Sequence, residues 1–321
     1  MLELLSRGYE VNLLILRSES NKRLVDLHLS TGTRALEIEI GFSLKFFCRY
    51  ICGYYSKVYF SQFSLRSLYY FFVPVKKVVV ISHRDYPVNI EFLKSKLSSL
   101  KLMILGLPWV INVAVSRDLA RSLPGSPLVI HNRSWREFSF QDVLKSSRRI
   151  DLLFVGRLDK DKGLDLLLDI IQRLDSKVGP RLRVTVVGVG PMAPLLESLA
   201  SKSLQRIQLE CHKKLDDVVL QELFLDAKVL IMPSRYEGYG LVGVEALKAG
   251  CVLIASDISA IKEATYSQGI YISDNLPEAF VLEVATQLAS FKTISQNSWI
   301  ACRNTFDFRR TVDEYLAIFA E

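Results

Sequence analysis

The sequence lacks a hydrophobic stretch long enough to cross a membrane as a helix. Its longest apolar run, 102–115, is interrupted by Gly106, Pro108 and Asn112. The run is also shorter than the roughly 20 residues that a spanning helix needs. The first residues do not show the pattern of a secretory signal either. We therefore expect neither an integral membrane protein nor an exported one.

Cysteine is scarce, with five residues in a chain of 321. A small, odd number in a chain of this length does not fit a disulfide framework and indicates reduced thiols, which are typical of a cytoplasm. Cys48 and Cys52 lie one helical turn apart, but no second pair of Cys or His completes a zinc site. We expect a cytoplasmic protein with core cysteines and no bound metal.

Acidic residues are absent between Glu39 and Asp85, where Lys and Arg alternate with Phe and Tyr. Residues 1–150 carry 22 Lys and Arg against 11 Asp and Glu, and the rest of the chain carries 19 against 23. Cations among aromatic side chains suit the headgroups of an anionic membrane, so we expect peripheral contact with the inner face of a cell membrane. No recognition-helix, RNP or zinc-finger pattern supports nucleic acid as the partner. The simplest alternative is a core of aromatics beneath an ordinary basic surface.

Length and periodicity predict two α/β domains. A chain of 321 residues exceeds the usual size of one core. Apolar strand-like runs alternate with amphipathic stretches, as in doubly wound parallel sheets. In the first half these runs are 11–16, 35–40, 58–60, 77–82 and 110–115. We expect a domain over 1–148 that includes a polar linker at 126–148, a second domain over 149–302, and a C-terminal helix within 303–321.

The most informative stretch, 232–256, reads MPSRYEGYGLVGVEALKAGCVLIAS. A buried strand ends before its Pro and Ser, a short apolar helix ends at Gly250, and a second β-branched run follows. Gly238 and Gly240 in the loop allow a ligand to approach the backbone closely. The amides of residues 240–242 open the helix and form a ready anion site.

Two glutamates, Glu237 in this loop and Glu245 in the helix, have distinct expected roles. A carboxylate within an apolar helix suits two hydrogen bonds from a vicinal diol such as a ribose, whereas one near anion-binding amides suits sugar hydroxyls. The alternative is that Glu245 belongs to a solvated helix face and that Glu237 only benefits from the helix dipole.

Two further loops follow strands, and each contains a pair of candidate residues. Arg157 and Lys162 lie in GRLDKDKG, and Gly188 and Gly190 lie in VGVGP. Loops at the carboxyl ends of parallel strands converge where strand order reverses, so both cations can reach a diphosphate there. The alternatives are a solvated charged turn for the cations and a tight turn for the glycines. The first of these two loops also contains an Asp-x-Asp pair at 159–161. We discount this pair as a metal site because Arg157 and Lys162 already neutralise phosphate.

The motif PSRYEGYGLVGVEALKAG resembles the signature loop and helix of the family-4 (group 1), GT-B retaining glycosyltransferases, with a Glu, seven residues and a second Glu. The resemblance implies two Rossmann-like doubly wound domains facing across a cleft. It implies donor-sugar contact for Glu237, ribose contact for Glu245 and diphosphate contact for Arg157 and Lys162. VVVISH resembles the family strand whose final His, here His83, faces the donor sugar. The remaining implied donor-binding residues are Gly188, Gly190, Gly238, Tyr239, Gly240, Leu241 and Val242.

The resemblance implies transfer of a hexose or related sugar from a nucleoside diphosphate to a hydroxyl, with retention and without a metal or other cofactor. The acceptor is expected to be a sugar or a lipid-linked sugar in bacterial cell-surface polysaccharide or glycolipid synthesis. The departing diphosphate would take the acceptor's proton, so no Ser or Cys nucleophile is needed. Two alternatives stay open: a sugar-nucleotide epimerase of the same fold, and a non-catalytic or truncated subunit.

The chain departs from the family pattern in several places. Arg133 stands where Gly is usual after Asn132, Val252 where Pro is common, and Ala260 where Gly is frequent. In the family, a first strand and a glycine-rich loop precede the helix that residues 1–7 resemble. We therefore expect the first domain as given to lack its first strand, and the coding sequence to begin further upstream.

Overall fold

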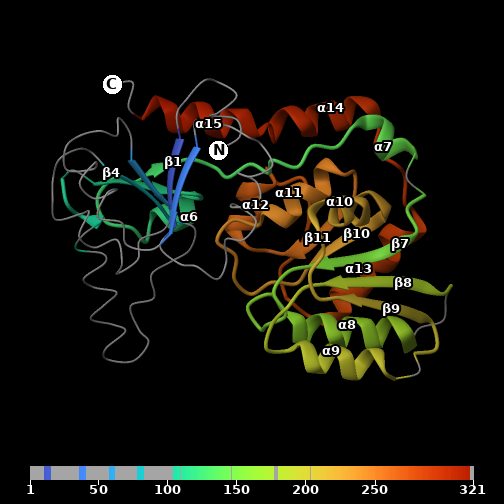
Figure 1. The fold of residues 1–321 in the computed structure, drawn as a ribbon. Helices are drawn as coiled ribbons and strands as arrows, with labels where there is room; N and C mark the ends of the chain where they lie inside the picture. The colour runs from blue at the N-terminus through green and yellow to red at the C-terminus, as the bar shows by residue number, and fades with distance from the viewer. Residues whose placement is uncertain are drawn as a thin grey trace, which may run out of the picture. The chain divides into compact units, whose positions relative to one another are not determined.

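The structure is a computed structural model of the chain (Figure 1). It describes strands 11–15, 36–40, 58–61 and 78–82, and residues 103, 105–108, 110–145, 147–176, 180–202 and 204–318. The chain divides into two compact units, one formed by 1–130 with 309–321 and the other by 131–308. Residues 131–148, part of the linker expected from the sequence, belong to the second unit.

The described strands of the first unit form two parallel sheets. One pairs β1 (Val11–Ile15) with β2 (Leu36–Ile40). The other has the order β3 (Val58–Ser61), β4 (Val78–Ser82), β5 (Val110–Ala114) and β6 (Leu128–Val129). The five strands predicted here are confirmed to within one residue at each end. Among the described strands, no ladder joins the two sheets.

The last helix of the chain, α15 (Phe308–Ala317), contributes to the core of the first unit. Tyr315 and the following Ile318 pack against Val113 of β5 and Ile130. Both Val113 and Ile130 are buried. The C-terminal residues therefore stabilise the sheet that contains β5, although they lie nearly 200 residues further along the chain.

The second unit contains one six-stranded sheet in the order β12-β11-β10-β7-β8-β9, and every pairing in it is parallel. The strands are β7 (Ile150–Val155), β8 (Leu182–Val187), β9 (Ile207–His212), β10 (Ala227–Met232), β11 (Val252–Ser256) and β12 (Ile270–Ile272). The first strand, β7, is central, and strand order reverses between β7 and β10. This is the doubly wound arrangement that the sequence predicts.

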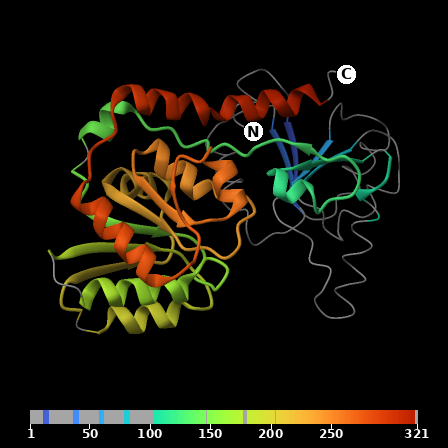
Figure 2. The same cartoon turned by 180° about the vertical axis from the view of Figure 1, so that it is seen from behind.

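The helices of the second unit are α7 (Phe140–Lys145), α8 (Leu164–Ser176), α9 (Ala193–Ala200), α10 (Asp217–Asp226), α11 (Leu241–Lys248), α12 (Ser259–Ala264), α13 (Pro277–Ala289) and α14 (Gln296–Thr305). In Figure 1, α8 and α9 lie on one side of the sheet and α10, α11 and α12 on the other. The reverse view in Figure 2 brings α13 to the front, where it packs against α8. Both faces of the sheet are therefore covered, which explains why its central strands are continuous apolar runs.

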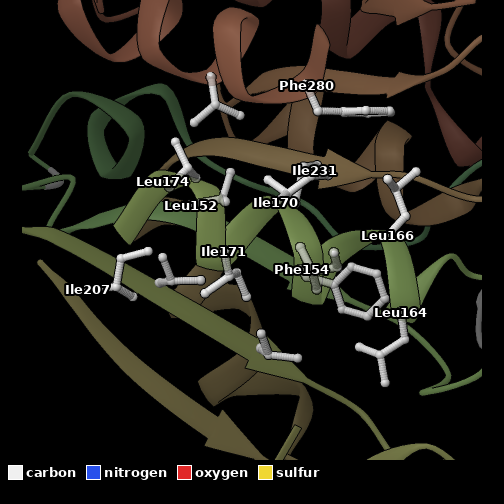
Figure 3. Close-up of a cluster of buried hydrophobic side chains, with 14 of the residues drawn as sticks. Leu152, Phe154, Leu164, Leu166, Ile170, Ile171, Leu174, Ile207, Ile231 and Phe280 are labelled. Atoms are coloured by element: carbon white, nitrogen blue, oxygen red, sulfur yellow. The ribbon is translucent and has the colours of Figure 1, made fainter. Parts of the chain in front are cut away.

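The main core of the second unit lies between the sheet and the pair α8 and α13 (Figure 3). Leu152 and Phe154 of β7 meet Ile170 and Ile171 of α8 and Phe280 of α13, all of them buried. α8 presents this face because its apolar residues recur at helical spacing, with Asp and Arg on the opposite side. The apolar run of β7 and the helical apolar period of α8 make both elements predictable from the sequence.

Several elements of this unit are not predicted from the sequence, namely β9 and the elements α12, β12, α13 and α14. β9 is an edge strand, and its residues Gln208 and Glu210 are exposed. Its polar sequence, IQLECH, therefore lacks the apolar run of the central strands. β12, at the other edge, has only three residues, all half-buried.

The described cysteines carry free thiols. Burial raises the pKa of Cys251 to about 11 and that of Cys302 to about 12. Both thiols therefore stay protonated and behave as small core residues. Cys48 and Cys52, which the sequence analysis expects in the core, lie outside the described residues.

Candidate functional site

Three loops follow neighbouring strands at the carboxyl edge of the second unit's sheet. We call them the β7 loop (156–163), the β8 loop (188–192) and the β10 loop (233–240). In open parallel sheets, ligands bind outside the carboxyl ends of the strands where strand order reverses. That reversal lies between β7 and β10, so the β7 and β10 loops flank it.

Backbone hydrogen bonds join these loops. The Arg235 amide of the β10 loop donates to the Asp161 carbonyl of the β7 loop over 2.8 Å. On the other side, the Leu158 amide donates to the Val189 carbonyl over 3.0 Å. The three loops therefore form one hydrogen-bonded assembly instead of three independent turns.

Glycines permit this close packing. A Cβ at Gly163 would lie 1.8 Å from the Pro233 carbonyl oxygen, and one at Gly188 would lie 1.8 Å from the Gly156 carbonyl oxygen. A Cβ at Gly190 would meet the backbone of the β7 loop at 2.4 Å. Loop packing alone therefore explains why positions 188 and 190 require glycine. These two glycines do not by themselves indicate a bound ligand.

Lys162 and Glu237 come together across the β7 and β10 loops. Lys162 Nζ lies 2.6 Å from Glu237 Oε2, and only 20% and 10% of the two side chains are exposed. Ser234 Oγ donates to the other carboxylate oxygen, Oε1, over 3.0 Å. The Lys162 amide donates to Asp159 Oδ1 over 3.0 Å, which fixes the backbone of the lysine. A cation and a carboxylate are thus held side by side at the strand-order reversal.

Arg157 has a different setting, because 58% of its side chain is exposed. Its guanidinium lies 2.9 Å from an oxygen of Asp159 and 3.5 Å from one of Asp161. Both aspartates of the Asp-x-Asp pair therefore contact this arginine. Exposed pairs of this kind contribute little to stability, so Arg157 can exchange its partners for a ligand at low cost.

The start of α11 carries no side-chain cap. Gly240 occupies the N-cap position with a φ of +98°. The first amides of a helix lack intrahelical acceptors, and the helix dipole favours a negative charge beside them. Leu241 and Val242, which carry two of these amides, are half-buried.

Tyr239 packs inward just before this helix. It is 5% exposed, and its ring stacks on that of His131 at a centroid distance of 5.8 Å and an interplanar angle of 25°. His131 Nε2 lies 2.7 Å from Glu263 Oε1 of α12. The ring of Tyr239 thus braces the loop that carries Gly238 and Gly240.

Glu245, one turn into α11, is held by residues that the sequence does not single out. Ser134 Oγ donates to Glu245 Oε1 over 2.9 Å, and Arg136 Nε donates to the same oxygen over 3.1 Å. Burial raises the pKa of Glu245, and the nearby charge of Arg136 opposes that rise. No spacing rule links positions 134 and 136 to 245. The only available signal is that a carboxylate in an apolar helix needs a partner.

The structure therefore assembles the candidate residues of the second unit on one edge of one sheet. His83, the candidate from the first half of the chain, lies outside the described residues. The basic, aromatic stretch between Glu39 and Asp85 also lies outside them, apart from Ile40, β3 and β4.

Comparison with curated proteins finds relatives that share part of the chain. D-inositol 3-phosphate glycosyltransferase of Geodermatophilus obscurus is 31% identical over 182 residues, which cover 52% of this chain and 39% of that protein. A protein of Klebsiella pneumoniae described as an uncharacterized 41.2 kDa protein in the cps region is 32% identical over 115 residues, 36% of this chain and 30% of that protein. The chain thus spans between 30% and 39% of the length of these relatives.

Solved structures share the architecture over nearly the whole chain. The Anabaena protein HepE in complex with UDP and glucose matches 100% of this chain and 95% of its own, with a TM-score of 0.73 and 14% identity. Sucrose-phosphate synthase of Thermosynechococcus elongatus matches 99% and 91%, with a TM-score of 0.70 and 15% identity. At these identities, the likeness establishes the fold.

The family Glycosyl transferases group 1 matches residues 136–296, which make up half of the chain. The matched segment contains the β7, β8 and β10 loops, helix α11 and both glutamates of the motif. The chain therefore belongs to the group 1 glycosyl transferases and has the GT-B fold.

Proposed function

We propose that the protein transfers a hexose or related sugar from a nucleoside diphosphate sugar to an acceptor hydroxyl, with retention of anomeric configuration. The observation that carries this proposal is the Lys162–Glu237 pair beside the uncapped start of α11. A diphosphate leaving group develops negative charge, and preorganised cations and amides stabilise such charge most effectively where little water is present. The family resemblance supports retention.

Each residue of the site has a defined part in this proposal. The diphosphate lies on the start of α11, where Lys162 and Arg157 neutralise it. Once Lys162 turns to phosphate, Glu237 remains positioned by Ser234 and accepts hydrogen bonds from the donor sugar's hydroxyls. Glu245 accepts hydrogen bonds from the ribose. The departing phosphate oxygen takes the proton of the acceptor hydroxyl, so no covalent enzyme intermediate is required.

Metal independence is also part of the proposal. A divalent ion at the diphosphate would need oxygen ligands from the loops around it. The β7 loop instead supplies two cations, Arg157 and Lys162, which can balance the charge of the diphosphate. We infer that side-chain cations and helix amides do the work of a metal here.

A panel of nucleotide sugars tests the function. Thermal-shift binding with UDP-, GDP-, ADP-, CDP- and dTDP-sugars is expected to find one class that raises the melting temperature. UDP-glucose is the first choice, because the structurally similar HepE is described in complex with UDP and glucose. Labelled donor should then lose its sugar to an acceptor or to water, and NMR of the product should show the donor's anomeric configuration.

Other results of the same panel support the alternatives. Conversion of the sugar while it stays attached to the nucleotide would indicate an epimerase. Binding without hydrolysis or transfer to any acceptor offered would indicate a non-catalytic subunit. No binding of any member of the panel would contradict the proposed function.

The acceptor is proposed to be a sugar or lipid-linked sugar of a bacterial cell-surface polysaccharide, reached at the inner face of the cell membrane. The support is the acid-free, aromatic stretch between Glu39 and Asp85, together with the relative described as lying in a cps region. Within the part of the chain that the structure describes, no helix is long and apolar enough to span a bilayer.

We expect the protein to co-sediment with vesicles of phosphatidylglycerol and phosphatidylethanolamine but not with vesicles of phosphatidylcholine. Each cation near an anionic surface contributes about 1 kcal/mol, and raising the salt concentration should weaken the attraction because the Debye length shortens. Equal binding to both kinds of vesicle, or to neither, would rule out this contact.

A further inference from the structure

Two cations, Arg136 beside α11 and Lys248 in its last turn, are buried, although cations usually remain in water. Only 8% of the Arg136 side chain and 2% of the Lys248 side chain are exposed. Lys248 Nζ donates to the Ser134 carbonyl over 3.0 Å and lies 3.1 Å from Glu137 Oε1. The segment 134–137 is therefore fastened to the helix that carries Glu245. Buried cations need an explanation, since removing them from water is costly unless each one has partners.

Arg136 uses three nitrogens of its guanidinium at once. Nε donates to Glu245 Oε1 over 3.1 Å. Nη1 and Nη2 donate to the carbonyl and to the carboxylate of Asp217, over 2.9 and 2.7 Å. Asp217 is the first residue of α10, so one planar group spans α10 and α11. These three hydrogen bonds leave the guanidinium little freedom to rotate.

Ser134 completes the arrangement around the same oxygen of Glu245. Its hydroxyl donates to Glu245 Oε1 over 2.9 Å and accepts from the Arg136 amide over 3.2 Å. Both hydrogen bonds to the carboxylate therefore use Oε1. An ionised carboxylate has about four acceptor positions, so the two on Oε2 remain for other donors. Glu245 is 13% exposed, which keeps it in reach of a ligand.

We propose that Arg136 is a positioning residue of the donor site: together with Ser134, it holds Oε1 of Glu245 so that Oε2 is presented to the two hydroxyls of the donor's ribose. This inference rests on the proposed function, in which Glu245 contacts the ribose. Two hydroxyls on adjacent carbons form good hydrogen bonds with one carboxylate only when its plane is fixed. The guanidinium of Arg136, itself held by Asp217, fixes that plane through its hydrogen bond to Oε1.

Charge supports the same assignment. Burial alone favours the protonated form of Glu245 and raises its pKa, while Arg136, Ser134 and Lys248 favour the ionised form. A protonated carboxyl would accept fewer hydrogen bonds from a diol. Arg136 therefore has two effects on one carboxylate, since it orients the group and opposes the rise in its pKa that burial causes.

The test compares a ribonucleotide with its 2′-deoxy analogue, which lacks one hydroxyl of the diol. Calorimetry measures Kd for UDP and dUDP, or for the corresponding pair if the panel identifies another base. Wild-type protein is expected to bind the ribonucleotide at least about tenfold more tightly, because the lost hydroxyl leaves a charged acceptor unpaired. In Arg136→Met this ratio should fall close to one, and in Ser134→Ala it should fall partway.

A merely structural role for Arg136 would weaken both nucleotides equally and leave the ratio unchanged. Two further variants separate these cases. In Glu245→Gln the preference for the ribonucleotide over its 2′-deoxy analogue should already be small. Adding Arg136→Met should reduce this preference no further, because both residues act through the Glu245 carboxylate. Arg173→Met is the matched control, since Arg173 pairs with Asp169 and Glu278 on the surface of α8 and α13. This control should retain the wild-type ratio.

The outcomes distinguish this inference from the function on which it rests. A wild-type ratio that persists in Arg136→Met contradicts the positioning role while leaving the glycosyltransferase proposal intact. Additive losses in the Arg136→Met, Glu245→Gln double variant contradict it as well. Failure of the wild-type protein to bind any nucleoside diphosphate overturns both.

Discussion

Replacing Lys162 by Ala is expected to reduce kcat at saturating donor by about 10²-fold or more, while the fold stays intact. The ammonium lies 2.6 Å from Glu237, and both side chains are mostly shielded from water. A charge on the leaving diphosphate would interact strongly with a cation held in this setting. The effect should fall on kcat, because charge on the leaving group develops in the transition state and not on binding.

Glu237→Ala is expected to cause a loss of similar size, also about 10²-fold. Removing either partner leaves the other one shielded from water and unpaired, so the pair should behave as a unit. The double variant should then lose less activity than the product of the two single losses. Steady-state kinetics on the four proteins, with the donor that the nucleotide panel identifies, measure this coupling.

Lys228→Ala is the matched control for the Lys162 variant. Lys228 Nζ lies 2.7 Å from Asp151 Oδ1, with 31% and 13% of the side chains exposed, so the pair is similar in length and burial. It lies at the amino ends of β10 and β7, the edge of the sheet opposite the loops. The kcat of the Lys228→Ala variant should stay near the wild-type value. Near-full turnover in both Lys162→Ala and Glu237→Ala would show that the site is wrongly assigned.

Most of the second unit is predictable because its strands and helices have simple burial patterns. β7 and β10 are buried on both faces and therefore appear as apolar runs, and α8 is half-buried with a helical period. Edge elements lose this signal: β9 contains exposed polar residues, and β12 has only three residues, all half-buried. The loops of the site follow from topology, because alternation of strand and helix brings the ends of parallel strands to one edge.

The contacts of Glu245 are not predictable in the same way. Residues 126–148 look like a linker because they are polar and basic, and arginines are expected on the surface. The structure buries Arg136 and Arg148 from this stretch within the second unit. Arg148 donates to the Ala227 carbonyl over 2.7 Å and to the Ala249 carbonyl over 2.6 Å. Composition cannot distinguish such an arginine from a solvated one, because the partners are backbone oxygens some 80 to 100 residues away.

The packing of the loops leads to a second large expected effect, on stability. Gly163→Ala should lower the free energy of unfolding of the second unit by about 4 kcal/mol or more. Two causes combine: a φ of +70°, which costs an L residue about 1 to 2 kcal/mol, and overpacking, which costs about 1 to 3 kcal/mol or more. The overpacking is severe because the new Cβ would lie 1.8 Å from the backbone oxygen of Pro233. A backbone oxygen cannot rotate away as a side chain can.

Three other glycines on the same edge of the sheet separate these two causes. Gly240 has a φ of +98° but only ordinary contacts of 3.5 Å or more, so Gly240→Ala should show the conformational cost alone, about 1 to 2 kcal/mol. Gly188→Ala should show the steric cost alone, about 3 kcal/mol, because its Cβ would meet a carbonyl oxygen at 1.8 Å without a positive φ. Gly156 has neither problem, since its nearest contact is 3.5 Å, and its Ala variant should stay within about 1 kcal/mol of wild type. Urea titration followed by circular dichroism measures the free energy of unfolding of the four variants. If Gly163→Ala is no less stable than Gly156→Ala, the β7 and β10 loops do not pack as described.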